Sequence, residues 1–171
     1  MATAPKGAAI KPKVPPPKPE KPTYWLEKQG SGEPHIVVSL GEQRAYFYKG
    51  KKLVGETIVS TGRTGFDTPP GTYRVIQKDQ NHASTLYGDF VDAAGEVVKG
   101  GVDSTKDHAP EGSVFRGAKM PYFLRFHAGY GLHAGYVPNR RASHGCVRLP
   151  REMARHFFEN APAGTPVILR E

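Results

Sequence analysis

From residue 35 onward, hydrophobic and polar positions alternate along the chain as they do in half-buried β-strands. Residues 35–40 and 44–48 flank a short polar segment, 41–43, and this arrangement predicts a β-hairpin. A Lys- and Gly-rich turn at 49–52 leads to a third predicted strand over 53–60. The first third of the folded region is therefore expected to be an antiparallel meander.

Downstream, the alternating pattern returns in shorter pieces. Residues 61–71 form a predicted loop closed by Pro-Pro-Gly, and 72–77, 122–126 and 165–169 alternate as strands. Residues 79–121 are rich in Gly and Asp and have few strong periods. We interpret them as an irregular excursion with short strands, where a flap over a functional site would lie.

The pattern changes to a helical one only after Pro150. Met153, Ala154, Phe157 and Phe158 form one apolar stripe at 3.6-residue spacing, and Asn160 and the 162–164 segment end it. The pattern predicts a mainly β domain, a sandwich or barrel, with one or two short helices.

The N-terminal segment has a different composition from the rest. Residues 1–22 alternate seven prolines with five lysines and leave almost nothing to bury, which predicts an extended, polyproline II-like linker. We therefore divide the chain into a disordered linker, 1–24, and a folded domain, 25–171. The linker suits a solubilising spacer or attraction to anionic polymers better than nucleic-acid binding, because no aromatic residue is interleaved for base stacking.

Neither a membrane span nor a signal peptide is predicted. No apolar run approaches 18 residues, and the linker lacks the apolar stretch of a signal peptide. The length of 171 residues suits one core of ordinary size, and the net charge of +8 is shared by the linker and the domain.

Cys146 is the only cysteine, so it cannot form an internal disulfide and must serve packing, metal ligation or nucleophilic chemistry. A thiol attacks as thiolate and needs a base or a cationic environment. His144 lies two residues before it and His133 thirteen, and histidine is the side chain best suited to accept the proton. Gly145 permits a tight turn with backbone N–H groups free for an oxyanion.

The segment 143–149, Ser-His-Gly-Cys-Val-Arg-Leu, resembles the signature of the L,D-transpeptidase catalytic domain family (YkuD-type). Residues 131–135 are similar to that family's upstream histidine segment, and 59–62 and 68–73 to its strand and turn elements. The resemblance covers roughly residues 35–170. It implies the family's mainly β fold, a cysteine-dependent acyltransferase activity and no cofactor.

Roles follow as hypotheses. Cys146 is expected to be the nucleophile and His133 its base, with the Ala134 carbonyl or a nearby one fixing the imidazole tautomer. The N–H groups of Gly145 and Cys146 are the expected oxyanion donors. Arg148, on the same side of an extended segment as Cys146, would grip a carboxylate unless it is a surface ion-pair residue.

Other pocket residues carry two interpretations each. His144 is expected to brace the turn or line the pocket rather than transfer a proton, and Ser143 is either a turn residue bonded to backbone or a substrate contact. Tyr122 is a candidate pocket hydroxyl, although a core or rim position suits both it and Tyr87 better.

The resemblance implies that the substrate is a peptidoglycan stem tetrapeptide. The acceptor stays open: an amine on another stem gives a cross-link, a lipoprotein amine gives an anchored protein, and water gives L,D-carboxypeptidase trimming. The resemblance also implies a monomer in the periplasm or cell envelope, with any export signal or anchor outside this sequence.

Two other classes of function were considered. His127, His133, His144 and Cys146 could form a zinc site, but they lack paired ligand spacing, and positions 113–150 contain no acidic residue to act as base. A non-catalytic wall-binding module would not need Cys146, His133 and Arg148 together.

Local sequence does not choose between two similar histidines, because His127 and His133 are both followed by Ala-Gly-Tyr. Six residues of extended strand span about 20 Å, so both rings can reach one thiol only if the chain folds sharply between them. The loop of twelve residues between His133 and Cys146 and the family resemblance both favour His133 as the base.

Overall fold

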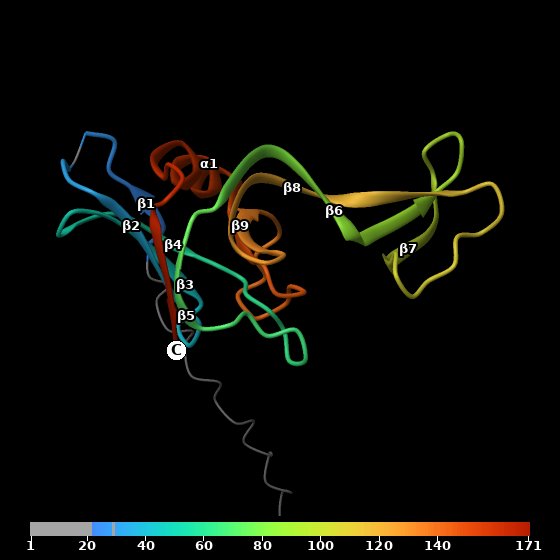
Figure 1. Ribbon diagram of the computed structural model, residues 1–171, viewed down its shortest axis with the longest axis horizontal. Helices are drawn as coiled ribbons and strands as arrows, with labels where there is room; N and C mark the ends of the chain where they lie inside the picture. Colours follow the sequence, from blue (N-terminus) through green and yellow to red (C-terminus); the bar gives the residue numbers. More distant parts are fainter. Residues whose placement is uncertain (1–21, 29) are drawn as a thin grey trace, which may run out of the picture.

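The computed structural model describes residues 22–28 and 30–171, which form two β-sheets and one α-helix (Figure 1). The first sheet has the strand order β1-β4-β3-β2-β11-β5 and the second has the order β10-β9-β8-β6-β7. The elements are β1 (Tyr24–Trp25), β2 (Pro34–Ser39), β3 (Arg44–Lys49), β4 (Lys52–Ile58), β5 (Gly71–Arg74), β6 (Gln77–Val91), β7 (Val97–Asp103), β8 (Val114–His127), β9 (Tyr130–Ala134), β10 (Val147–Leu149), α1 (Arg151–Asn160) and β11 (Pro166–Arg170).

The first sheet confirms the predicted meander. β2 pairs with β3 and β3 with β4, both antiparallel, and β11 returns parallel to β2 and antiparallel to β5. Along β2, Ile36 and Val38 are fully buried, as the alternation in the sequence requires. The predicted strand over 72–77 is shorter in the structure, because β5 ends at Arg74 and β6 starts at Gln77.

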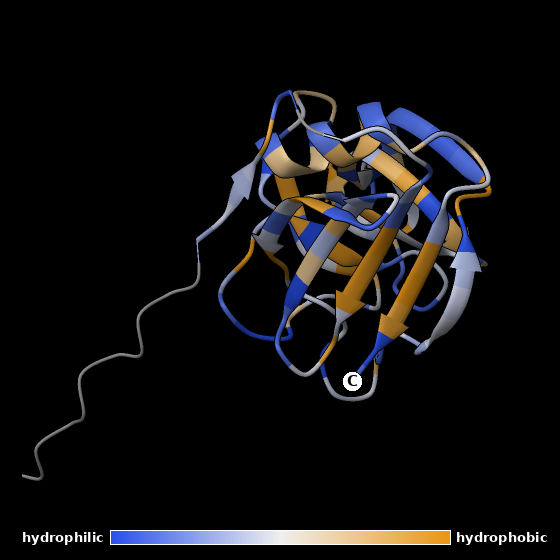
Figure 2. Cartoon of the chain, turned by 90° about the vertical axis from the view of Figure 1, so that its left-hand side faces the viewer, coloured by the Kyte–Doolittle hydropathy of each residue, from blue (hydrophilic) through white to orange (hydrophobic). Residues whose placement is uncertain are grey.

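The core lies between the two sheets and under α1, where the hydrophobic strand positions converge (Figure 2). Met153, Ala154 and Phe157 of α1 are buried in it, and the Phe157 ring meets Phe47 edge to face at 5.2 Å between centroids. Phe158 lies at the edge of this core. The helix predicted after Pro150 is therefore confirmed, with its apolar stripe on the inner face.

Residues 79–121 are not irregular, and that expectation was wrong. Most of them belong to β6 and β8, strands of 15 and 14 residues that pair antiparallel and carry β7 at their far end. We call residues 82–120 the arm, because they project from the body of the molecule (Figure 1). Along most of the arm neither face is buried, so the strands need no hydrophobic alternation and give no periodic signal.

The described residues begin at Pro22, inside the linker expected over residues 1–24. Tyr24 belongs to β1, which pairs with β4, and the Pro22 carbonyl accepts a hydrogen bond from Arg44 at 2.7 Å. The Trp25 ring stacks on His156 at 4.8 Å and contacts Phe47. The linker expected over residues 1–24 otherwise lies outside the described residues. In the part of the chain that is described, no helix has the length and apolarity needed to cross a membrane.

Candidate active site

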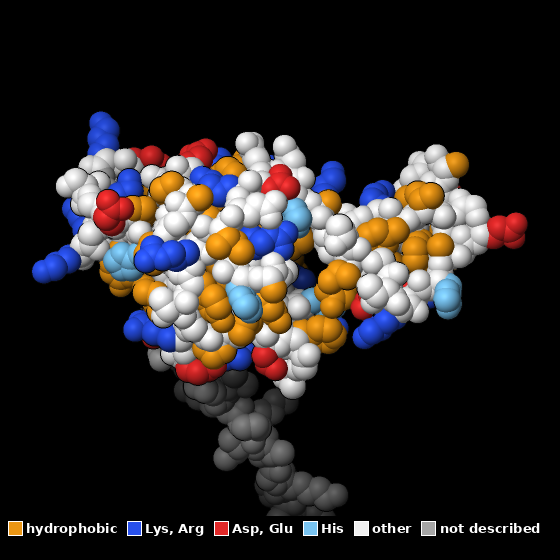
Figure 3. Space-filling model, in the orientation of Figure 1, with side chains coloured by type: hydrophobic (Ala, Val, Ile, Leu, Met, Phe, Trp, Pro, Cys, Tyr) orange, Lys and Arg blue, Asp and Glu red, His pale blue; other side chains and the backbone are white. Residues whose placement is uncertain are grey.

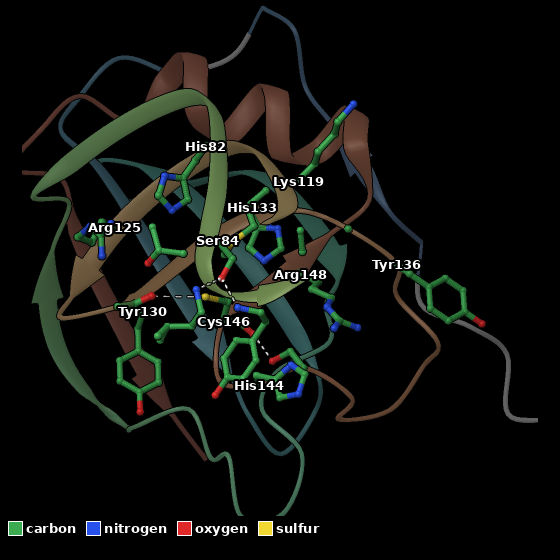
Figure 4. Close-up of a pocket in the computed structure, with 18 residues that line it drawn as sticks. His82, Ser84, Lys119, Arg125, Tyr130, His133, Tyr136, His144, Cys146 and Arg148 are labelled. Carbon is green, nitrogen blue, oxygen red and sulfur yellow. Dashed lines mark hydrogen bonds between the residues drawn. The ribbon is translucent and has the colours of Figure 1, made fainter. Parts of the chain in front are cut away.

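A cavity of about 560 Å³ lies where the base of the arm meets β9 and β10 (Figure 4), and the surface is hollowed where the arm joins the body (Figure 3). We call residues 131–135 and 143–148 its floor. The lining residues are His82, Ser84, Thr85, Leu86, Tyr87, Ala118, Lys119, Met120, Arg125, Gly129, Tyr130, His133, Gly135, Tyr136, Ser143, His144, Cys146 and Arg148. Five of the site residues expected from the sequence are among them, and Gly145 and Tyr122 are not.

The turn that carries Cys146 is held by buried hydrogen bonds. The Ser143 hydroxyl donates to the Cys146 carbonyl at 2.5 Å and accepts from the Gly145 N–H at 3.0 Å, while Thr68 donates to the Gly145 carbonyl at 2.6 Å. Gly145 has φ +125°, and a Cβ there would lie 2.6 Å from the Tyr130 ring. Only glycine fits at position 145. The turn that carries the thiol is therefore fixed by the hydrogen bonds of Ser143 and Thr68 and by its close approach to the Tyr130 ring.

These contacts decide between the two interpretations of Ser143 in favour of the turn residue, since both of its bonds are to local backbone. They also change the oxyanion expectation. The Gly145 N–H already donates a hydrogen bond to the Ser143 hydroxyl. Of the two expected oxyanion donors, the Cys146 N–H is therefore the one that remains.

The thiol is half-buried and donates to the Gly129 carbonyl at 3.6 Å. Burial raises the pKa of Cys146, and the Gly131 backbone N–H, Arg125 and Arg148 oppose that rise without cancelling it. The group is therefore a neutral thiol near neutral pH. It needs a base to become nucleophilic.

His133 can supply that base. Its Nδ1 lies 2.7 Å from the Ala134 carbonyl and must donate to it, so Nε2 carries the free lone pair. Burial lowers the pKa of His133 and the Ala134 hydrogen bond opposes that fall, while the nearby Arg148 charge adds to it, so that the pKa is about 4. The imidazole is neutral over the physiological range and ready to accept a proton. The contact with Ala134 is the one that the sequence predicted.

Arg148 is placed beside His133 by strand pairing. β10 runs parallel to β9 with Arg148 opposite His133, and the cavity receives both side chains (Figure 4). A Cβ on Gly135 would lie 3.2 Å from the Arg148 stem, so this glycine leaves room for the arginine. Within residues 22–28 and 30–171, the Arg148 guanidinium has no hydrogen-bond or ion-pair partner, which argues against the surface ion-pair interpretation.

His144 joins the floor to the arm. Its ring stacks on Tyr87 at 4.1 Å and 9°, and it meets Phe66 edge to face at 5.0 Å. Burial lowers the pKa of His144, and the charges of Arg63 and Arg148 lower it further. A neutral imidazole held between two rings fits the expected bracing and pocket-lining role.

Tyr122 lies outside the cavity, so its proposed place in the site was wrong. Its ring packs edge to face on Phe158 at 5.7 Å and under the Arg151 guanidinium at 5.4 Å. It takes φ +57° in the middle of β8, where the strand passes the helix. The rim interpretation of this tyrosine is the better one.

The argument that separated His127 from His133 rested on an extended chain, and this premise was wrong. β8 and β9 form a tight hairpin in which His127 pairs with Tyr130 across Ala128 and Gly129. His127 nevertheless stays outside the cavity lining, exposed and stacked on Tyr130 and Tyr73. The choice of His133 therefore stands on its place in the cavity.

The sequence missed the part of the cavity that the arm provides. Between Ala83 and Gly88 the register of β6 against β8 shifts, and residues 84–87 bulge into the cavity. The one local signal is Gly117, where a Cβ would lie 1.9 Å from the Ser84 carbonyl, but a single glycine does not reveal such a bulge.

The described residues hold no group of three or more His, Cys, Asp and Glu side chains suited to a metal ion. The zinc site considered from the sequence also needs His127, whose ring is engaged by Tyr73 and Tyr130 instead.

Comparison with known proteins agrees with the fold. The family model described as YkuD, L,D-transpeptidase catalytic domain, matches residues 33–169. The chain belongs to this family. A curated relative, the probable L,D-transpeptidase YbiS of Escherichia coli K12, is 33% identical over 138 residues, which cover 77% of this chain and 43% of that protein. The chain thus spans less than half the length of this relative.

Two solved structures share the fold. The L,D-transpeptidase from Mycobacterium smegmatis superposes with a TM-score of 0.62 at 19% identity, covering 81% of this chain and 59% of that one. The L,D-transpeptidase LdtMt1 in complex with imipenem gives 0.58 at 16% identity, covering 80% and 58%. The predicted mainly β L,D-transpeptidase-like fold is confirmed, with one helix among the described residues.

Proposed function

We propose that this protein is a cysteine-dependent L,D-transpeptidase that acts on peptidoglycan stem peptides. One observation carries the proposal: a neutral, buried imidazole with its Nε2 lone pair free shares a cavity with a thiol fixed on a rigid turn. This pair provides a nucleophile and a base and requires no cofactor.

In the first half-reaction His133 Nε2 accepts the Cys146 proton as the sulfur attacks the carbonyl of the third stem residue, a diamino acid. A C–S bond forms and the carbonyl oxygen becomes an oxyanion, for which the Cys146 N–H is the donor. The tetrahedral intermediate collapses by breaking the C–N bond to the terminal D-alanine. His133 returns the proton to the leaving amine, and a thioester remains.

In the second half-reaction an amine attacks the thioester, loses a proton to His133 and takes the acyl group, which restores the thiol. A neighbouring stem as acceptor produces a cell-wall cross-link. The alternatives are a lipoprotein amine as acceptor, which attaches a protein to the stem, and water, which makes the enzyme an L,D-carboxypeptidase. Where the leaving amine of the first half-reaction belongs to a lipoprotein, the same two steps with water as acceptor detach that protein.

The charge of the cavity supports an anionic peptide donor. Lys119 and Arg148 line it, and its lining includes no Asp or Glu. Arg148 is suited to the donor carboxylate because its planar fork accepts a carboxylate in two parallel hydrogen bonds. Because peptidoglycan stems are the substrate, we also propose an envelope or periplasmic location and action as a monomer.

The proposal is tested with defined muropeptides and mass spectrometry. The wild-type protein should release D-alanine from a tetrapeptide stem, and a carbapenem should add its mass once, at Cys146. Cys146→Ala should do neither and keep the wild-type melting temperature, because the change in volume is small. Arg155→Met, on the exposed face of α1, serves as the control. Normal turnover by Cys146→Ala would overturn the enzyme assignment, and carbapenem acylation distinguishes an enzyme from a wall-binding module.

A further inference from the structure

A second arginine, Arg125, lies at the cavity but is held very differently from Arg148. Arg125 lies on β8, where it pairs with Gln77 of the neighbouring strand β6 and with Gly131 of the neighbouring strand β9. Its Nε donates to Gln77 Oε1 at 2.7 Å, and its guanidinium covers the Phe123 ring at 5.0 Å. The side chain is therefore oriented before any substrate arrives.

The other end of the guanidinium supports the hairpin turn between β8 and β9. Arg125 Nη1 donates to the Ala128 carbonyl at 2.6 Å. Ala128 has φ +44°, a left-handed conformation that is strained for a residue with a Cβ. A turn that contains such a residue needs support from its surroundings, and this charge-assisted hydrogen bond provides it.

The supported turn is the segment that meets the thiol. The carbonyl of Gly129, the residue after Ala128, accepts the Cys146 S–H bond at 3.6 Å. Two residues further on, the Gly131 N–H favours the thiolate, as does the charge of Arg125 itself. A shift of this turn by a few tenths of an ångström would change both backbone contacts of the sulfur at once.

We propose that Arg125 is a positioning residue for Cys146. Through its hydrogen bond to the Ala128 carbonyl, Arg125 holds the Gly129 carbonyl and the Gly131 N–H against the sulfur of Cys146. This proposal rests on the proposed function in taking Cys146 as the nucleophile. Arg125 has its Nε and Nη1 donors committed to Gln77 and Ala128, so it acts on the protein, whereas Arg148 is free to bind a substrate carboxylate.

The test measures the thiol without any substrate. Alkylation by iodoacetamide, a small neutral reagent, is followed as a function of pH for the wild type, Arg125→Met and Arg125→Lys, with Arg155→Met as the control. Arg125→Met should shift the profile to higher pH by about one unit, so alkylation at pH 7 falls about tenfold. Arg125→Lys keeps the charge but cannot reach both partners, so about half of the shift should remain.

A superimposable profile for Arg125→Met overturns the proposal, even if its melting temperature falls, because a structural role alone would not move the titration. Complete rescue by Arg125→Lys also overturns it, since charge alone would then suffice. Gln77→Ala keeps the arginine and removes only its Nε partner from an exposed position, and it should slow alkylation at pH 7 about twofold. This variant keeps the test decisive if Arg125→Met does not fold.

Comparing iodoacetate with iodoacetamide distinguishes positioning from anion binding. If Arg125 acts on the thiol, Arg125→Met slows both reagents by the same factor. A loss confined to iodoacetate shows that Arg125 attracts anions, and this outcome contradicts the proposal. Alkylation needs no muropeptide, so failure of this inference is distinguishable from failure of the transpeptidase assignment.

Discussion

The two sides of the cavity are built by different means. The floor is tied to the rest of the body by hydrogen bonds between distant segments, including Ser60 with Arg148 and Thr68 with Gly145. Among the described residues, the ring stack of Tyr87 on His144 joins the arm to the floor. Such a stack contributes about 0.5–1.5 kcal/mol, less than the network opposite it. The proposed nucleophile and base thus lie on the side of the cavity that has the denser network of hydrogen bonds.

The largest effect should follow the loss of the base on the floor. His133→Ala should lower the rate of carbapenem acylation at neutral pH by at least about a hundredfold, the usual scale for a general base. His127→Ala is the matched control, because His127 is followed by the same Ala-Gly-Tyr sequence but lies on the exposed hairpin. This variant should lower the acylation rate only slightly. Acylation rates of both variants measure this directly. A greater loss in His127→Ala would reverse the assignment.

The same histidine should make the floor sensitive to acid. Its pKa is about 4 in the folded protein, below the value near 6.5 expected when unfolded, so the unfolded state binds the proton first as pH falls. The contribution of His133 to the free energy of unfolding is complete above about pH 6.5. On the order of 3 kcal/mol of it is lost as the pH falls to 4. Urea unfolding at pH 7 and pH 4 should show a smaller pH-dependent loss in His133→Ala. Equal losses would contradict a buried neutral imidazole.

Arg148 should show an intermediate effect. Arg148→Lys keeps the charge but loses the two-pronged donor, so kcat/KM on a tetrapeptide should fall by about 1–3 kcal/mol of transition-state binding. Arg141→Lys, which alters an exposed partner of Glu171, is the control. Unchanged kinetics in Arg148→Lys at unchanged stability would remove Arg148 from the site.

The arm should give the smallest effect. Tyr87→Leu removes the stack on His144 and keeps an apolar side chain, so KM for the tetrapeptide should change by about two- to tenfold while kcat stays near the wild-type value. Tyr136→Leu changes a tyrosine at the cavity edge that is 76% exposed and should leave KM unaltered. A fall in kcat equal to that in His133→Ala would show that the arm takes part in the chemistry.

The sequence predicted the regions whose side chains alternate because one face is buried. β2, β3 and α1 were predicted from Ile36, Val38, Phe47 and Phe157, each of which occupies the core. Cys146, His133, His144 and Arg148 were predicted from a local signature and meet at one cavity.

What the sequence did not predict depends on contacts across long distances. Tyr87 lies on an arm with both faces exposed, and nothing near it in the sequence indicates that its ring will meet His144. Tyr122 was kept as a pocket candidate for its hydroxyl, although the rim position was the favoured interpretation, and its ring packs on Phe158 outside the cavity. The His127 argument failed because Ala128 adopts a left-handed conformation that is rare for a residue with a Cβ, so the turn was not expected.

The parallel pairing of β9 with β10 has a consequence for the loop between them. Because Arg148 is aligned with His133 by the ladder, the covalent path through residues 136–142 does not set the distance between base and nucleophile. A chain cut at the exposed Tyr136 should still reassemble its two halves, each of which carries one member of the proposed catalytic pair.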